Sequence, residues 1–408
     1  MTARRTPADT AEHAARTAYG RLLALLSSRS RDIAAAEDAL AAAFASALAS
    51  WPASGVPDNP DAWLFTAARR NLGAARSRAA TATASEALLL QLAEERAAAD
   101  APDFPDERLK LLFVCAHPGI APAVQAPLML QTVLGLDAAR IAAAFMVTPS
   151  AMGQALVRAK SRIRQSGIAF TIPAPEQRAA RLHAVRQAIY AAYGTGWDAL
   201  TTDNAKLAAL APEASFLARL LLEQAPHEPE SQGLLALILF CEARQPARRT
   251  ADGNFVPLHK QDPKLWHGSK LAEAEALLSA AARAHRPGRF QLEAAIQSLH
   301  TQQRMTGQTL HGPLISLYDQ LLAEAPSLGA AIARAAALTE AGAPAAALAA
   351  LDALSVACVS HQPWWAARAR ALHASGQAEA ARAAAERAAG LSHDPAVRRF
   401  LLSNNFFA

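Results

Sequence analysis

The stretch Leu136–Arg164 reads LDAARIAAAFMVTPSAMGQALVRAKSRIR, and its pattern of apolar residues indicates helices. Apolar residues recur at helical spacing on both sides of a short turn, at Ile141, Phe145, Met152 and Leu156. Thr148 is a typical N-cap, and Pro149 suits the first helical position, where a missing N–H costs nothing. The stretch therefore predicts two helices that cross over a short turn, a helix-turn-helix.

The second predicted helix is rich in bases and has no acid. Between Met146 and Ile172 the chain contains neither Asp nor Glu, and its basic residues are Arg158, Lys160, Arg162 and Arg164. A recognition helix places the residues near its N-terminus at base edges. We expect that role for Ser150, Ala151 and Gln154, and we include the cap residue Thr148 among the DNA-binding residues. The four basic residues are expected to contact phosphates. The alternative is a solvated basic face on an ordinary helix.

Residues 11 to 80 also have helical periodicity. Apolar side chains recur at Ile33, Leu40, Phe44 and Leu48. The stretch from Pro52 to Pro60 interrupts this pattern, and Asn59 is a predicted N-cap with Pro60 at the first helical position. The following helix carries Trp63 on its apolar stripe, so we expect that ring in the core. From Ala62 to Ser85 this segment has no acid.

Composition favours an all-α protein of two or three domains. The chain has 408 residues, of which 52% are hydrophobic, much of that alanine, and only 6% are aromatic. Alanine is the best helix former and a poor strand former. The net charge of +5 permits nucleic-acid binding without requiring it.

The cysteines and the apolar runs exclude several classes of protein. Cys115, Cys241 and Cys358 lie far apart, with no spacing typical of a disulfide framework or a zinc site. Cys115 and His117 alone supply too few ligands for a metal. No phosphate-binding loop and no Ser/His/Asp grouping is present. The longest apolar run, Leu234–Cys241, is too short to span a membrane, so we expect a cytoplasmic protein.

From about residue 178 the pattern changes to helical hairpins with an internal repeat. Four residues recur at an offset of 34 residues: Arg334, Leu338, Gly342 and Ala346 reappear as Arg368, Leu372, Gly376 and Ala380. This is the period of tetratricopeptide (TPR) repeats. A loop-like insert, Arg244–Trp266, contains the turn signal Asp252-Gly253-Asn254. We predict domains at 11–80, 105–170 and 178–408, with a linker at 81–104.

Two phrases and the basic helix together resemble a known family. The phrases are AEDALAAAF at Ala36–Phe44 and PDNPDAWL at Pro57–Leu64, and the basic helix ends at Val157–Arg164. They resemble the extracytoplasmic-function (ECF) sigma factors of the sigma-70 family. The rest of the chain resembles the TPR-like extension of one ECF subgroup, in the phrases Asp106–Leu109, Cys115–Pro118, Gln261–Asp262 and Gln291–Ile296.

This resemblance implies a function and a set of partners. Residues 11–80 would be a sigma region 2-like bundle, 105–170 a region 4-like helix-turn-helix, and 178–408 a TPR-like domain. Glu37 and Asp38 would bind core RNA polymerase, and the helix-turn-helix would read the −35 element of promoter DNA. The −10 element would be opened by residues of the second N-terminal helix, namely Arg69, Arg70, Asn71, Arg76 and Arg78.

The resemblance further implies a transcription initiation subunit that performs no covalent chemistry and needs no cofactor or metal. A regulatory protein would bind the C-terminal domain, and no membrane is expected as a partner. The sequence departs from the family at Ala41 and Ala42, where Gln-Glu is usual, and Gly153 lies inside the recognition helix. The alternative is therefore a degenerate sigma-like TPR scaffold, which binds proteins but does not initiate transcription.

Overall fold

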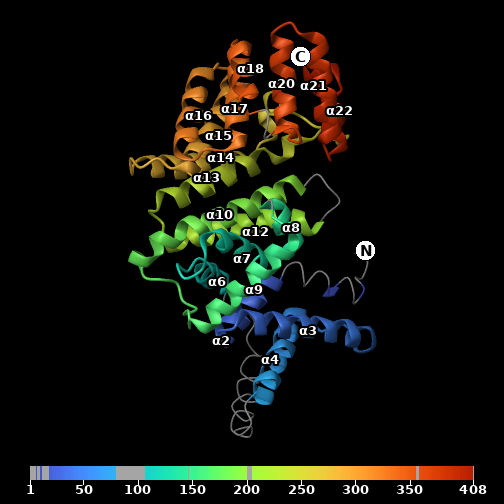
Figure 1. The fold of residues 1–408 in the computed structure, drawn as a ribbon, viewed down its shortest axis with the longest axis vertical. Helices are drawn as coiled ribbons and strands as arrows, with labels where there is room; N and C mark the ends of the chain where they lie inside the picture. The colour runs from blue at the N-terminus through green and yellow to red at the C-terminus, as the bar shows by residue number, and fades with distance from the viewer. Residues whose placement is uncertain are drawn as a thin grey trace. The chain divides into compact units, whose positions relative to one another are not determined.

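The computed structural model describes residues 6, 10–11, 18–79, 106–145, 147–199, 205–354 and 358–407. Over these residues the chain is all-α, as the composition predicted, and its extended pairing is limited to one isolated bridge between Arg249 and Phe255. The chain forms two compact units, Met1–Leu217 and Ala218–Ala408 (Figure 1). The boundary between the units lies inside the helix α12 (Leu210–Gln224).

The first three helices of the N-terminal unit are α2 (Tyr19–Ser30), α3 (Ile33–Ser54) and α4 (Pro60–Ala79). Their apolar faces share one core, whose largest fully buried side chains include Leu22, Leu26, Leu40, Trp51 and Phe65. The Asn59 side chain accepts a hydrogen bond from the Ala62 N–H at 3.0 Å, so the predicted cap and helix start are confirmed.

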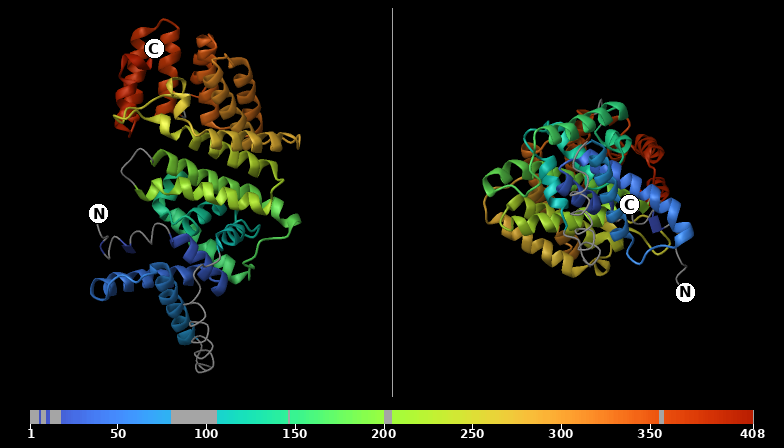
Figure 2. Two further views of the ribbon diagram at one scale, coloured as in Figure 1. Left: turned by 180° about the vertical axis from the view of Figure 1, so that it is seen from behind. Right: turned by 90° about the horizontal axis from the view of Figure 1, so that it is seen from below.

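The remaining helices of this unit are α6 (Arg108–Cys115), α7 (Pro122–Thr132), α8 (Ala138–Ala144), α9 (Pro149–Gln165), α10 (Pro175–Ala199) and α11 (Ala205–Ala208). Helix α9 packs against α7 and α8 on one side and against α3 on the other (Figures 1 and 2). Helix α2 also packs against α6 and α7. The helices of 18–79 and those of 106–165 therefore form one packed body.

Gly20 marks the closest approach within this body. A Cβ atom at Gly20 would lie only 1.9 Å from the Val133 carbonyl oxygen, far inside van der Waals contact. Only glycine therefore allows α2 to pack so closely against the end of α7.

The division between the two units differs from the predicted domain boundary. The sequence analysis began the C-terminal domain at residue 178, whereas the compact units divide after Leu217. Helix α10 packs against α6 and α7, and Arg181 donates a hydrogen bond from Nη1 to the Phe113 carbonyl at 3.2 Å. The predicted linker at 81–104 lies outside the described residues.

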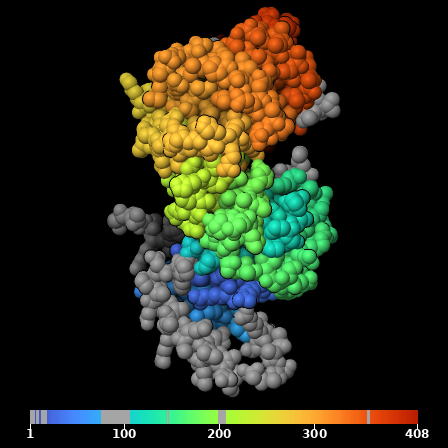
Figure 3. Space-filling model, turned by 90° about the vertical axis from the view of Figure 1, so that its left-hand side faces the viewer, coloured from blue at the N-terminus to red at the C-terminus, as the bar shows by residue number. Residues whose placement is uncertain are grey.

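The C-terminal unit is a series of antiparallel helices. After the second half of α12 these are α13 (Pro229–Arg244), α14 (Gly268–Ala282), α15 (Arg289–Thr306), α16 (His311–Glu324), α17 (Leu328–Glu340), α18 (Pro344–Asp352), α20 (Gln362–Ala374), α21 (Ala378–Leu391) and α22 (Pro395–Leu401). Consecutive helices from α13 to α18 pack side by side, as do α20 and α21, and the gold to orange atoms of α15–α18 form one continuous surface in Figure 3.

The residues of the predicted 34-residue repeat occupy equivalent turns. Gly342 has φ +80° and Gly376 has φ +78°, and each follows the helix that opens a hairpin. The next N–H in each turn bonds the carbonyl of the matching leucine, Leu338 at 2.9 Å and Leu372 at 3.0 Å. The left-handed φ explains why glycine recurs at this position.

The insert between α13 and α14 contains three short 3₁₀ turns, at Gln245–Arg248, Leu258–Lys260 and Pro263–Leu265. It contacts the end of the chain, because Arg249 pairs with Asp394 and Lys260 Nζ donates to the Asn405 carbonyl at 3.0 Å. The predicted turn in this insert is present, and Gly253 has φ +77°.

Among the described residues, α3 is the one helix long and apolar enough to cross a membrane. The sequence analysis did not single it out, because its apolar run is interrupted by serines. One face of α3 lies in the core of the N-terminal unit, through Leu40, Ala43 and Ala47. A core helix of this kind satisfies the same length and composition test.

Candidate nucleic-acid interface

Helix α9 begins where the sequence predicted. Thr148 Oγ1 accepts a hydrogen bond from the Ala151 N–H at 3.3 Å, and Pro149 occupies the first helical position. Met152, Leu156 and Ile163 bury one face of α9. Ser150, Ala151 and Gln154, the three residues predicted to reach base edges, are exposed at the N-terminal end of α9, as is Thr148.

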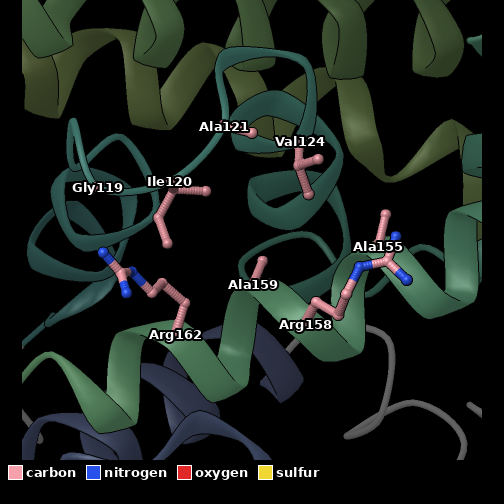
Figure 4. Close-up of a pocket in the computed structure, with 8 residues that line it drawn as sticks. All are labelled: Gly119, Ile120, Ala121, Val124, Ala155, Arg158, Ala159 and Arg162. Carbon is pink, nitrogen blue, oxygen red and sulfur yellow. The ribbon is translucent and has the colours of Figure 1, made fainter.

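The four basic residues of α9 divide between two sides of the helix. Arg158 and Arg162 are exposed and have no ion-pair partner among the described residues. They rise from the two ends of a pocket of about 260 Å³, which lies between α9 and the start of α7. Figure 4 shows Ala159 between the two arginines, beneath Ile120 and Val124. This side of α9 presents two cations around a small apolar hollow.

Lys160 and Arg164 instead face α3. The Lys160 side chain is 9% exposed, and its Nζ lies 2.5 Å from Glu37 Oε2. Arg164 Nη1 lies 3.5 Å from Asp32 Oδ2, and Asp32 also caps α3 by accepting from the Ala35 N–H at 3.1 Å. A residue predicted to hold DNA and a residue predicted to bind polymerase are therefore paired with each other.

Polar groups of α2 and α6 interact electrostatically with the Glu37–Lys160 pair. Burial raises the pKa of Glu37 above its ordinary value of 4.5, although Lys160 acts in the opposite direction. Burial, and then the charge of Glu37, raise the pKa of Tyr19 in α2. Burial also raises the pKa of Cys115 to about 12, and its sulfur lies 3.6 Å from the Thr132 hydroxyl. Cys115 is therefore a buried neutral thiol.

The other predicted polymerase-binding positions lie on the outer side of α3. Asp38 is exposed and has no ion-pair partner among the described residues. Ala41 and Ala42 are also exposed. ECF sigma factors, which the sequence resembles, usually carry Gln-Glu at these two positions, which here face outward and present only methyl groups.

The residues of α4 that were predicted to contact DNA differ in their exposure and in their hydrogen bonds. Asn71 donates from Nδ2 to the Ala39 carbonyl at 3.2 Å, so its amide joins α4 to α3. Arg69 is half-buried and Arg70 is exposed. The side chains of Arg76 and Arg78 lie outside the described residues. Trp63 packs edge-on against the buried Trp51 at 5.4 Å, which confirms the core role expected for it.

The amino-acid sequence of this chain is similar to those of known proteins. Residues 181–282 match a family of unknown function, DUF6596. An uncharacterized protein of Rhizobium meliloti (strain 1021), R00370, is 37% identical over 369 residues, which cover 89% of this chain and 87% of the Rhizobium protein. The chain belongs to the R00370 family. No solved structure matches it. The DUF6596 segment of this R00370 family member runs from α10 to the last residue of α14.

The sequence analysis missed the structural role of Arg108 in this member of the R00370 family. Arg108 is buried, pairs with Asp106 at 2.6 Å and with Glu213, and lies over the Phe216 ring at 4.9 Å. Burial would raise the pKa of Asp106, but Arg108 lowers it below its usual range. The phrase Asp106–Leu109 therefore joins α6 to α12. The pairing of Arg108 with Asp106 is predictable because the two residues are close in the sequence. Nothing in the sequence indicated the pairing of Arg108 with Glu213.

The C-terminal unit of this R00370 family member holds a polar pocket of about 260 Å³. Polar groups from the insert, α15 and α17 line it, including His259, His300, Gln303, Arg304 and Glu340. Burial and then neighbouring cations lower the pKa of His259 and that of His300 to about 4, so both rings are neutral at pH 7. The described residues contain no group of three His, Cys, Asp or Glu that could hold a metal. The sequence analysis missed this pocket because its residues are far apart in the chain.

Proposed function

We propose that the protein is an alternative sigma factor of the ECF type, which directs core RNA polymerase to promoters. In this proposal α9 reads the −35 element, α4 opens the −10 element, and α3 docks on the polymerase. The observation that carries the proposal is α9 itself, a capped and acid-free helix behind a short turn, with an accessible N-terminal end.

The spacing on the outer side of α9 supports DNA binding. Gln154, Arg158 and Arg162 follow one another at four-residue steps, so they lie along one face of the helix, and all three are exposed. A major groove about 12 Å wide admits a helix, and glutamine pairs bidentately with adenine. The arginines suit phosphates, which position the helix without specifying the base sequence.

The test of the proposal is binding to purified core RNA polymerase, followed by selection of promoters from a random DNA library in transcription assays. We expect the full-length protein to bind core and to direct initiation from a defined pair of elements. Asp38→Arg should weaken core binding, because it reverses an exposed charge on the docking face of α3. Asp58→Arg, which reverses the charge of an exposed acid outside this face, is the matched control.

A second result of the same assay would reject the proposal. If neither the full-length protein nor residues 1–224, which include all of α12, bound core polymerase, the sigma assignment would be wrong. Binding by residues 1–224 alone would show instead that the C-terminal part inhibits docking.

The exposed methyl groups of Ala41 and Ala42 favour a second candidate, a protein-binding scaffold that has lost initiation. The double variant Ala41→Gln/Ala42→Glu restores the usual family pair on an exposed surface. A large gain in core affinity in this variant would support the scaffold, because it would show that the natural chain has lost docking contacts. Unchanged affinity in a chain that already binds would support the sigma factor.

A further inference from the structure

The polar pocket of the C-terminal unit has the features of a binding site, whatever the function of the N-terminal unit. It is formed by the 3₁₀ turn Leu258–Lys260 of the insert, by the end of α15 with the residues that follow it, and by Glu340 at the end of α17. Its volume of about 260 Å³ lies just below the range of about 300–1,000 Å³ that is usual for small-molecule sites. A ligand of this pocket is therefore small.

Hydrogen bonds and an ion pair fix the segments that form the pocket. Arg304 Nε donates to the Gln261 carbonyl at 2.7 Å, which joins α15 to the insert. Arg370 Nη1 of α20 lies 3.3 Å from Glu340 Oε1, which joins α20 to α17. The pocket is therefore formed before a ligand arrives, so binding requires little additional ordering of the chain.

Arg304 is the cation that a ligand can reach. Its side chain is exposed and has no ion-pair partner among the described residues. Because Nε is already bonded to the Gln261 carbonyl, the two terminal nitrogens Nη1 and Nη2 remain for a ligand. A guanidinium presents parallel N–H groups that match two oxygens of a carboxylate or a phosphate. The geometry at Arg304 therefore suits an oxyanion.

The charges around the pocket also favour an anion. Burial and then nearby cations lower the pKa of His259 and that of His300 to about 4, so neither imidazole is charged at pH 7. Glu340, the acid among the residues that line the pocket, is offset by Arg370, so positive charge remains in excess. The cations that act on the two rings are Arg244, Lys260, Arg304 and Arg370.

We propose that this pocket binds a small oxyanion, a carboxylate or a phosphate, two of whose oxygens are held by the terminal nitrogens of Arg304. Neutral side chains provide hydrogen bonds for the other polar atoms of the ligand, since a neutral imidazole has one donor and one acceptor and an amide has both. These side chains are His259, His300, Gln303, Gln308 and Thr309. Gln308 and Thr309 are exposed, so the ligand enters from solvent beside them.

The first experiment is calorimetric titration of the full-length chain with succinate and, separately, with inorganic phosphate, at fixed salt in a buffer free of other oxyanions. We expect saturable binding of at least one probe. Arg304→Gln should weaken it by about tenfold or more, because it removes a charge-assisted contact. Arg304→Lys should weaken it less, since the charge stays and the paired N–H groups are lost. Arg283→Gln, at an exposed arginine before the start of α15, is the control and should change the affinity by less than about twofold.

A second variant separates the loss of binding from misfolding. Gln308→Glu places an acid at the exposed rim with almost no change of shape, so it should weaken binding by about threefold to tenfold and leave thermal unfolding without probe unchanged. Absence of saturable binding for both probes would overturn the proposal. Equal losses in Arg304→Gln and Arg283→Gln would also overturn it, because they would show that net charge alone attracts the probes.

Nuclear magnetic resonance locates the bound probe. The Cε1–H signals of His259 and His300, assigned with His259→Gln and His300→Gln, should shift on saturation, whereas that of His285, before the start of α15, should not. Saturable heat without these shifts would place the probe elsewhere and overturn the proposal. Shifts with succinate alone would support a carboxylate ligand, and shifts with phosphate alone would support a phosphate ligand. Neither result depends on binding to polymerase, so the proposed function is tested separately.

Discussion

The two compact units differ in how far along the chain their ion pairs reach. In the N-terminal unit, Lys160–Glu37 and Arg164–Asp32 join residues 123 and 132 positions apart. In the hairpins of the C-terminal unit, Arg334–Asp319 and Arg368–Asp352 join residues 15 and 16 positions apart. Hairpins that contact mainly their neighbours gain stability roughly as a sum over adjacent pairs. The N-terminal unit depends instead on contacts between segments that are distant in the sequence.

Among the described residues of the C-terminal unit, the ion pair that joins the most distant positions lies between the insert and the end of the chain. Arg249 and Asp394 lie 145 positions apart, and both are largely shielded from water. This pair connects the insert to the last α-helix, so it closes the series of hairpins from its start to its end. In both units, these long-range ion pairs connect two segments that lie far apart in the sequence.

The largest effect that separates the two units is expected from Gly20→Val. The new side chain would overlap the Val133 carbonyl, and α2 would have to move away from α7. We expect the N-terminal unit to lose about 3 kcal/mol, the upper end for overpacking a tight site. Calorimetry should show an earlier first transition and an unchanged transition for the C-terminal unit. A single transition that shifts as a whole would show that the two units unfold together, which would remove this difference between them.

A somewhat smaller effect is expected from Lys160→Met. It leaves the Glu37 carboxylate largely buried without its partner, and we expect a loss of about 2 kcal/mol, less than for a fully buried pair because Glu37 keeps some solvent contact. The matched variant Arg334→Met removes the cation of a neighbour pair whose acid is more than half exposed, so it should cost less than about 0.5 kcal/mol. Urea unfolding of the two variants measures this difference, and similar losses would remove the contrast between the units.

The pH dependence of stability tests the same carboxylate. Burial raises the pKa of Glu37, so the folded chain holds that proton more tightly than the unfolded chain does. The stability contributed by Glu37 is therefore complete below its ordinary value of 4.5 and is lost as the pH rises through the higher, folded-state pKa. Lys160→Met should raise this pKa further, so the loss should extend to higher pH and become larger in total. Unfolding measured across this range, with Glu37→Gln as the control, should show that the part of the slope contributed by Glu37 is absent in the control.

Local patterns in the sequence were sufficient for much of the fold. The caps at Asn59 and Thr148 depend on one residue and its neighbours, and the turns at Gly342 and Gly376 depend on a left-handed φ that glycine adopts at little cost. Such signals are written within a few residues of the feature they produce. They were therefore visible before the structure was known.

The sequence did not predict which distant residues pair with each other. Glu37 and Lys160 each fitted a role on a separate helix, and nothing within either segment indicated that they meet. The same holds for Arg108 with Glu213, and for His259 with His300 around one pocket. A single sequence carries no signal for contacts of this kind, because many acids could satisfy each base. The predicted boundary at residue 178 differed for the same reason, since the packing of α10 on α6 is a long-range contact.

The smallest effect is expected from Gly153→Ala, which tests whether α9 is an ordinary helix on its outer side. A Cβ atom at Gly153 would meet nothing within 4 Å, and the residue lies in the helix interior. Alanine should therefore stabilise the N-terminal unit by up to about 1 kcal/mol, the difference between the two helix propensities. Thermal unfolding measures the gain, and DNA affinity should stay the same or rise slightly as α9 becomes more rigid. A loss of DNA affinity with a gain in stability would mean that DNA approaches the backbone at Gly153, which would place that residue at the interface itself.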